Sequence, residues 1–213
     1  MPDSFNDSSP LLAARGLAVT RLGEPIFGPL DLELRAGEVL LIEGDNGSGK
    51  TTLLRVLAGL LSASEGAIER HGVVCARPTH SVGFLSHALG LRADLSPVEQ
   101  LDFFACLHGV RPGISAAAAL LSVGLAGYEQ MPVRRLSAGQ RKRCALAALL
   151  HTANTLWLLD EPYANLDRDG QLLVDRLLES HIAHGGAAVI TSHGLIEPQI
   201  SRVRRMRLAL AHA

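Results

Sequence analysis

A glycine-rich stretch between two apolar segments constrains the fold more than any other feature of the chain. Residues 44–52 read GDNGSGKTT and match the pattern G-x-x-x-x-G-K-[ST]. The apolar run 39–42 precedes this stretch, and leucines at helical spacing follow it as far as Gly59. We therefore predict a buried strand, a glycine loop and a helix, which is the context that a phosphate-binding loop requires.

The chemistry of this loop suits a polyphosphate. Glycines let successive backbone N–H groups turn toward phosphate oxygens, and the helix that follows adds its positive N-terminal end. Lys50 is predicted to pair with the β- and γ-phosphates, and the Thr51 hydroxyl to ligate Mg²⁺. A glycine turn without function is the alternative, which the strand and helix on either side disfavour. The predicted nucleotide-binding residues are Gly44, Asp45, Asn46, Gly47, Ser48, Gly49, Lys50, Thr51 and Thr52.

Two carboxylates, Asp160 and Glu161, directly follow the apolar run at 156–159. The carboxyl ends of the strands are where open α/β folds hold ligands. Asp160 is predicted to orient Mg²⁺ through its water shell, and Glu161 to polarise the attacking water as general base. Two surface acids that simply end a strand would give the same pattern. The phosphate-binding loop upstream, in the expected order, favours the catalytic interpretation.

The pentapeptide Leu136, Ser137, Ala138, Gly139 and Gln140 has the form of a helix start. Ser137 fits the N-cap and Gln140 the third helical position, which together make a capping box. Gly139 removes a side chain from the first turn, so that a phosphate could approach the N–H groups and the Ser137 hydroxyl. The pentapeptide is therefore both a local helix signal and a candidate phosphate contact.

The order of strand and helix patterns predicts an α/β core with a helical insertion. Between roughly 88 and 150 there is no convincing strand pattern, whereas Ser96 begins a helix that extends to about 107, and 116–123 is a second helix candidate. Apolar runs at 156–159 and 187–190 predict buried strands, and the arginine-rich tail predicts an edge strand. We expect a flexible tail at 1–10 and one domain over 11–210, with its core at 11–87 and 150–210 and its helical lobe at about 88–149.

Composition and charge limit the function classes. The formal net charge of −1 gives no electrostatic case for nucleic-acid binding. Cys75, Cys106 and Cys144 lie far apart and form no C-x-x-C pair, which argues against disulfides and zinc and favours a reducing compartment. His181 and His184 could mimic a metal pair, but no third ligand is evident, so they are predicted to lie on a solvated helix face. Signal-peptide and membrane-spanning patterns are not found, so that any membrane role would be that of a peripheral subunit.

Several stretches together resemble one family. The pentapeptide at 136–140 closely resembles the L-S-G-G-Q signature of ABC ATPases, with Ala138 in place of the first glycine. The acid pair continues to an A-N-L-D stretch ending at Asp167, which resembles the D-loop, and His193 resembles the switch histidine. The resemblance covers about 11–210 and also includes the phosphate-binding loop.

This resemblance implies a fold and a mechanism. The fold would be an α/β P-loop NTPase with a RecA-like parallel sheet, an antiparallel N-terminal β part and an inserted ABC-type helical lobe. ATP and Mg²⁺ would be the cofactors, and His193 would donate a hydrogen bond to the γ-phosphate and the attacking water. The signature residues 136–140 of one copy would act on the nucleotide of a second copy, which makes a homodimer.

Two positions depart from the family pattern. His87 stands where a glutamine usually follows the strand, although a neutral imidazole can still exchange one hydrogen bond with a metal-bound water. The aromatic residue that usually stacks on adenine is missing near position 21. We expect either that Arg21 lies over the adenine face or that selectivity for the base is weak.

The short length, His87, the L-S-A-G-Q form and the missing C-terminal extension resemble the ATP-binding subunits of cytochrome c maturation haem-export systems. That resemblance implies an integral membrane permease as partner, haem handled by other subunits, and a peripheral place on the cytoplasmic face of the inner membrane. The permease would dock near 87–104, where Phe103 and Phe104 are candidates, although core packing is the commoner role for such residues. Another small ABC exporter, a soluble ABC ATPase acting on nucleic acid or ribosomes, and a non-hydrolysing switch are the alternatives.

Overall fold

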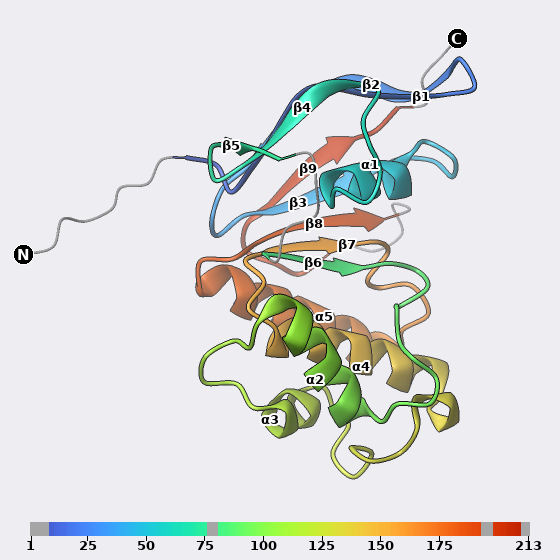
Figure 1. Ribbon diagram of the computed structural model, residues 1–213, viewed down its shortest axis with the longest axis vertical. Helices are drawn as coiled ribbons and strands as arrows, with labels where there is room; N and C mark the ends of the chain where they lie inside the picture. The colour runs from blue at the N-terminus through green and yellow to red at the C-terminus, as the bar shows by residue number, and fades with distance from the viewer. Residues whose placement is uncertain (1–8, 76–80, 193–197, 210–213) are drawn as a thin grey trace, which may run out of the picture.

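The parallel sheet at the centre of the molecule contains the strands that the apolar runs predict. The computed structural model describes residues 9–75, 81–192 and 198–209. Five parallel strands pair in the order β6-β7-β8-β3-β9 (Figure 1). They are β3 (Val39–Glu43), β6 (Val82–Leu85), β7 (Leu156–Leu159), β8 (Ala187–Ser192) and β9 (Val203–Arg207). Strands β7 and β8 are buried along their whole length because both faces of the sheet are covered.

Alternate side chains of this sheet enter two separate cores. Leu40 and Ile42 pack on the face covered by α1 (Lys50–Leu57) and the antiparallel sheet. Leu41 and Trp157 pack on the other face, against α4 (Ala138–His151) and α5 (Arg168–Ala183). The helix after the phosphate-binding loop and the helix after Ser137 therefore lie on opposite faces of the parallel sheet (Figure 1).

The second sheet is antiparallel, with the order β2-β1-β4-β5, as the family resemblance implies. It comprises β1 (Leu12–Arg21), β2 (Glu24–Leu34), β4 (Glu65–Arg70) and β5 (Val73–Val74). Only the last part of β2 follows a regular apolar alternation. The pairing of β1 with β2 shifts register between Ala14 and Leu17, and Gly16 has a positive φ of 55°. This bulge interrupts the two-residue period, which explains why the sequence pattern does not reveal β1.

The segment between β6 and β7 is helical, as predicted. It contains α2 (Pro97–His108), α3 (Ala116–Ser122), a 3₁₀ turn at Val133–Arg135, and α4. Ser96 and Glu99 form the predicted capping box, in which the Ser96 N–H donates to Glu99 Oε2 at 2.8 Å. Among the helices of the described ranges, none is both long and apolar enough to cross a membrane.

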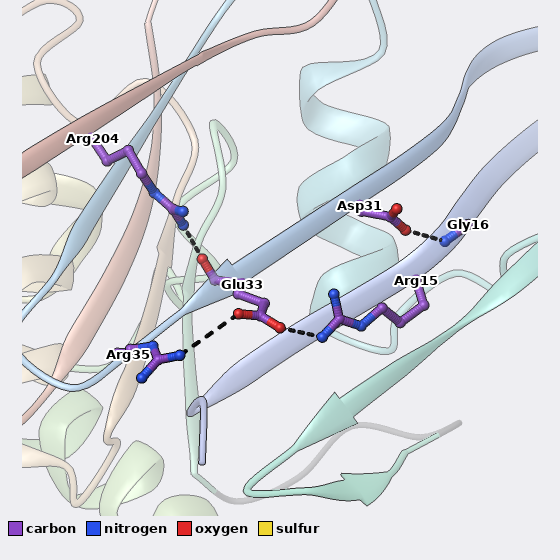
Figure 2. Close-up of polar contacts among 6 residues, drawn as sticks. All are labelled: Arg15, Gly16, Asp31, Glu33, Arg35 and Arg204. Carbon is purple, nitrogen blue, oxygen red and sulfur yellow. Dashed lines mark hydrogen bonds and ion pairs between the residues drawn. The ribbon is translucent and has the colours of Figure 1, made fainter. Parts of the chain in front are cut away.

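The predicted basic edge strand is β9, and an arginine connects it to the second sheet. Figure 2 shows Arg204 donating to the main-chain oxygen of Glu33 in β2, while the Glu33 carboxylate pairs with Arg15 and lies 3.9 Å from Arg35. These groups are partly exposed, so each ion pair contributes little to stability. The consequence of the Arg204 hydrogen bond is geometric, because it connects β9 to the end of β2.

The prediction for His181 is wrong, although His184 is exposed as expected. Only 2% of the His181 surface is accessible, and its ring stacks on Trp157 with centroids 3.9 Å apart. Nε2 lies 3.2 Å from the Ala187 carbonyl oxygen, and Nδ1 lies 3.4 Å from an Arg111 amino group. Burial, and secondarily the Arg111 charge, lowers the pKa of His181 to about 4. His181 follows Val174, Leu177 and Leu178 on the buried face of α5, so the helical spacing of these residues indicates that His181 is buried.

Buried, uncharged His181 predicts a pH-dependent stability. Its pKa is depressed in the folded state, so between pH 6.5 and pH 4 the unfolded chain binds more protons at this position. The free energy of unfolding is therefore expected to fall by about 3 kcal/mol as pH drops through this window. Urea unfolding of His181→Phe, which keeps an aromatic ring on Trp157, should show a shallower pH dependence than the wild type. His184→Gln is the matched control, and an equally shallow dependence there would contradict the assignment.

Candidate nucleotide site

The phosphate-binding loop has the predicted geometry, a turn between β3 and α1. Gly47 and Gly49 have positive φ values of 85° and 92°, and Gly49 is the N-cap of α1. A Cβ at Gly49 would lie 3.0 Å from Ile26 Cγ2 and 3.2 Å from Phe27 Cδ1, so β2 abuts the loop. A side chain at Gly49 would therefore be strained by the backbone conformation and crowded by β2.

Polar groups inside the loop have the character of an anion site. Lys50 is 6% exposed, and its Nζ donates to the main-chain oxygens of Gly44 at 2.6 Å and Asp45 at 2.9 Å. The Ser48 hydroxyl is buried and has no hydrogen-bond partner among the described residues. Within the described part of the chain, the buried Lys50 ammonium is held by carbonyl dipoles and the Ser48 hydroxyl has no partner, and both features favour a bound anion.

Asp160 is the centre of the site. Its Oδ2 accepts a hydrogen bond from Thr51 Oγ1, and its Oδ1 accepts one from Thr191 Oγ1, both at 2.8 Å. The Asp160 N–H donates to Leu85 O at 2.8 Å, which ties the end of β7 to the end of β6. The structure thus brings together Thr51 and Asp160, the two residues predicted to hold Mg²⁺ directly or through its water shell, across 109 residues of sequence. Hard oxygen donors of this kind, completed by phosphate oxygens and water, suit Mg²⁺.

Glu161 begins a turn with unusual backbone geometry. Its φ is 50°, and its N–H donates to Thr191 Oγ1 at 2.9 Å. A non-glycine residue in this region costs about 1–3 kcal/mol and persists where neighbouring contacts hold it. Thr191 therefore orients both acids, although sequence reasoning assigned it no role. The sequence feature that could have identified Thr191 is its hydroxyl at the carboxyl end of a buried strand. That strand lies beside the one that ends in Asp160.

A pocket of about 550 Å³ opens between these acids and the helical segment. Its lining includes His87, Asp160, Glu161 and Lys142 of α4. His87 is exposed at this pocket, so it lies on the same side of the sheet edge as the acid pair. Its role near a metal-bound water stays a prediction. Burial lowers the pKa of the Lys142 ammonium to about 8, while the Glu161 charge acts in the opposite direction.

The predicted signature residues form the start of α4. The Ser137 N–H donates to Gln140 Oε1 at 2.9 Å, and the Gln140 N–H donates to Ser137 Oγ at 3.2 Å, so the capping box is confirmed. Leu136 is buried, whereas Ser137 and Ala138 are exposed. A Cβ at Gly139 would meet nothing within 4 Å. The start of α4 therefore presents open space beside an exposed serine, while the capping box engages the N–H groups of Ser137 and Gln140.

Two further predicted residues, Asp167 and Arg21, are exposed and lie apart from this network. Asp167 is the exposed N-cap of α5, and its Oδ1 accepts a hydrogen bond from Gly170 N–H at 2.8 Å. Arg21 is exposed at the end of β1, and its contact with adenine stays a prediction. His193 lies outside the described residues, as do residues 1–8 of the expected flexible tail.

The fold and the site define an ATPase of the ATP-binding cassette class. The family described as "ABC transporter" matches residues 27–164. A solved ABC-transporter ATP-binding protein from Pyrococcus furiosus superposes with a TM-score of 0.79 at 25% identity, covering 91% of this chain and 96% of its own. The predictions of fold and of enzyme class are therefore confirmed.

The nearly full-length matches are more specific. The chain is 52% identical, over 99% of its length and all of the relative's, to the cytochrome c biogenesis ATP-binding export protein CcmA of Xanthomonas oryzae pv. oryzae. It is 46% identical to the protein of the same name in Xylella fastidiosa, over 91% of this chain and 89% of that one. The chain belongs to the ABC transporter family and, within it, to the cytochrome c biogenesis ATP-binding export proteins.

Proposed function

We propose that this chain hydrolyses ATP to energise haem export, or haem release from a carrier, during c-type cytochrome maturation. The observation that carries the proposal is the 52% identity over nearly the whole chain to a protein named for ATP-binding export in cytochrome c biogenesis. The assembled network of Thr51, Asp160 and Thr191 supports a hydrolytic site rather than a nucleotide-binding scaffold.

Each residue of the site has a defined part in hydrolysis. The loop N–H groups and Lys50 would bind the β- and γ-phosphates, replacing the carbonyl contacts that now hold the ammonium. When bound, Mg²⁺ supplies neutralisation of the phosphate charge, and Thr51 and Asp160 would hold it. Glu161 would accept a proton from the attacking water, and Thr191 keeps its backbone in place.

We further propose that two copies enclose each nucleotide. Helix α1 and helix α4 pack on opposite faces of the parallel sheet, and among the described residues the hydrogen bonds of Ser137 stay within the start of α4. The exposed, open start of α4 supplies a serine hydroxyl and N–H groups for the γ-phosphate held by a partner. A symmetric homodimer would then have two equivalent composite sites.

Mixing two inactive variants tests this arrangement. Lys50→Ala removes the phosphate contact, while Ser137→Asp keeps a good N-cap but repels the γ-phosphate. Each variant alone should be inactive. An equimolar mixture should recover about a quarter of wild-type hydrolysis, because half of the dimers contain one intact composite site. Mixtures as inactive as their components would contradict the composite site.

We also place the chain on the cytoplasmic face of the inner membrane, docked on a permease through residues near 87–104. Phe103 and Phe104 are half-buried there with ring centroids 5.6 Å apart, and Phe104 packs against the core. Part of their surface therefore belongs to packing, and part is free for a partner.

Complementation tests the haem-related role. In a Xanthomonas oryzae strain lacking its own CcmA, wild-type chain is expected to restore haem-containing c-type cytochromes, and Glu161→Gln is not. Haem staining of membrane fractions provides the measurement. Restoration by the native gene but not by this chain would contradict the proposal.

A further inference from the structure

A lysine of the signature helix reaches the turn that carries the proposed catalytic base. Lys142 lies in α4, five residues after Ser137 in the sequence, and its side chain is half-buried. Its Nζ donates to Glu161 O at 3.0 Å and to Ala164 O at 2.8 Å. Both acceptors are main-chain oxygens, so these two hydrogen bonds act on the backbone of the turn and not on the Glu161 carboxylate.

The turn requires such support because its backbone is strained at both ends. Glu161 and Asn165 have positive φ values of 50° and 60°. The Ala164 N–H donates to Glu161 O at 3.1 Å, so Lys142 adds a second donor to the oxygen that closes the turn. On the sheet side, Thr191 Oγ1 accepts from the Glu161 N–H at 2.9 Å. The backbone of Glu161 is therefore held from β8 at its nitrogen and from α4 at its oxygen.

We propose that Lys142 is a positioning residue for hydrolysis, which fixes the orientation of Glu161 by clamping the turn at 161–164 to the signature helix of the same chain. This inference rests on the proposed function, because it assumes that Glu161 is the general base. An ammonium suits the role because it donates to several acceptors from one flexible stem, and burial strengthens its bonds to carbonyl dipoles. A methionine side chain at this position has a similar length, so it would fill the space without donating a hydrogen bond.

The first test separates positioning from binding. Lys142→Met is expected to lower kcat by roughly 10- to 100-fold, because a displacement of about 1 Å at a catalytic group has that effect. KM for ATP should change little, since no loop residue is touched. Lys142→Arg, which keeps a cationic donor, should recover part of kcat. Lys142→Gln provides a folded alternative if the methionine variant does not fold.

Arg143→Met is the matched control. Arg143 lies on the same helix and also donates to a main-chain oxygen, that of Val123 at 2.9 Å, but on the side of α3. This variant is expected to lower stability while kcat stays within about threefold of wild type, because surface contacts outside the site affect stability and not transition-state binding. A kcat that falls equally in both variants would show that Lys142 acts only through helix stability, which overturns the inference.

The second test uses the mixed dimer with one intact site. In that dimer the Ser137→Asp chain supplies the phosphate loop and Glu161, and the Lys50→Ala chain supplies the signature residues. Adding Lys142→Met to the Ser137→Asp chain should lower the rate as in the homodimer, whereas adding it to the Lys50→Ala chain should not. The reverse result would show that Lys142 acts through the signature residues and not through Glu161, which would overturn the inference. Wild-type protein without hydrolysis would instead contradict the proposed function itself.

Discussion

Glu161→Gln is expected to lower ATP turnover by roughly 100- to 10,000-fold, the range that general-base catalysis usually contributes. The amide has nearly the same shape as the carboxylate but cannot accept a proton from water at neutral pH. The contacts at the backbone of Glu161 with Thr191 and Lys142 involve no side-chain atom of Glu161 and should persist. Phosphate release provides the rate, and ATP binding should be retained.

The same variant should accumulate as an ATP-bound dimer, because the two copies are expected to separate after hydrolysis and hydrolysis is blocked. Size-exclusion chromatography with and without ATP measures this effect. Glu65→Gln, at an exposed acid in β4, is the control and should behave as wild type. An unchanged hydrolysis rate in Glu161→Gln would remove Glu161 from the role of base.

Gly49→Ala is expected to weaken ATP binding by at least about 100-fold, equivalent to roughly 2.7 kcal/mol. The substitution combines a strained φ of 92° with a Cβ only 3.0 Å from Ile26 and 3.2 Å from Phe27. Phe27 is buried in the core beside the loop, so it has little freedom to move. The loop must therefore shift, which misaligns the N–H groups that would contact the phosphates.

Gly127→Ala is the matched control for backbone strain. Gly127 has a similar φ of 86°, but a Cβ there would meet nothing within 4 Å. Its expected effect is a loss of stability of about 1–2 kcal/mol with ATP affinity unchanged. Calorimetric titration with a slowly hydrolysed ATP analogue compares the variants. Equal affinity losses in both would indicate general destabilisation rather than damage to the loop.

The features that sequence reasoning predicted are those encoded locally. The loop at 44–52, the capping boxes at Ser96 and Ser137, and the buried strands β7 and β8 each depend on a few neighbouring residues. Local chemistry of this kind, such as a serine N-cap or an apolar run, needs no knowledge of the rest of the chain.

The features that it missed depend on contacts between distant segments. Thr191 acts because β8 lies beside β7, and Lys142 acts because α4 packs under the turn after β7. Neither residue type is diagnostic by itself. The burial of His181 was accessible from helical spacing, but the stacking with Trp157 that stabilises it required the register of α5 on the sheet. The residues that orient the site are thus harder to predict than those proposed to perform the chemistry.

The separation of α1 and α4 by the parallel sheet has a consequence for energy use in the cell. In the proposed two-copy arrangement a single copy would hold ATP but lack the second wall of the site, so turnover should depend on how often two copies meet. Dilute chains free in solution would then consume little ATP. Two chains tethered side by side on one membrane complex would meet at a high effective concentration, and hydrolysis would be confined to assembled complexes.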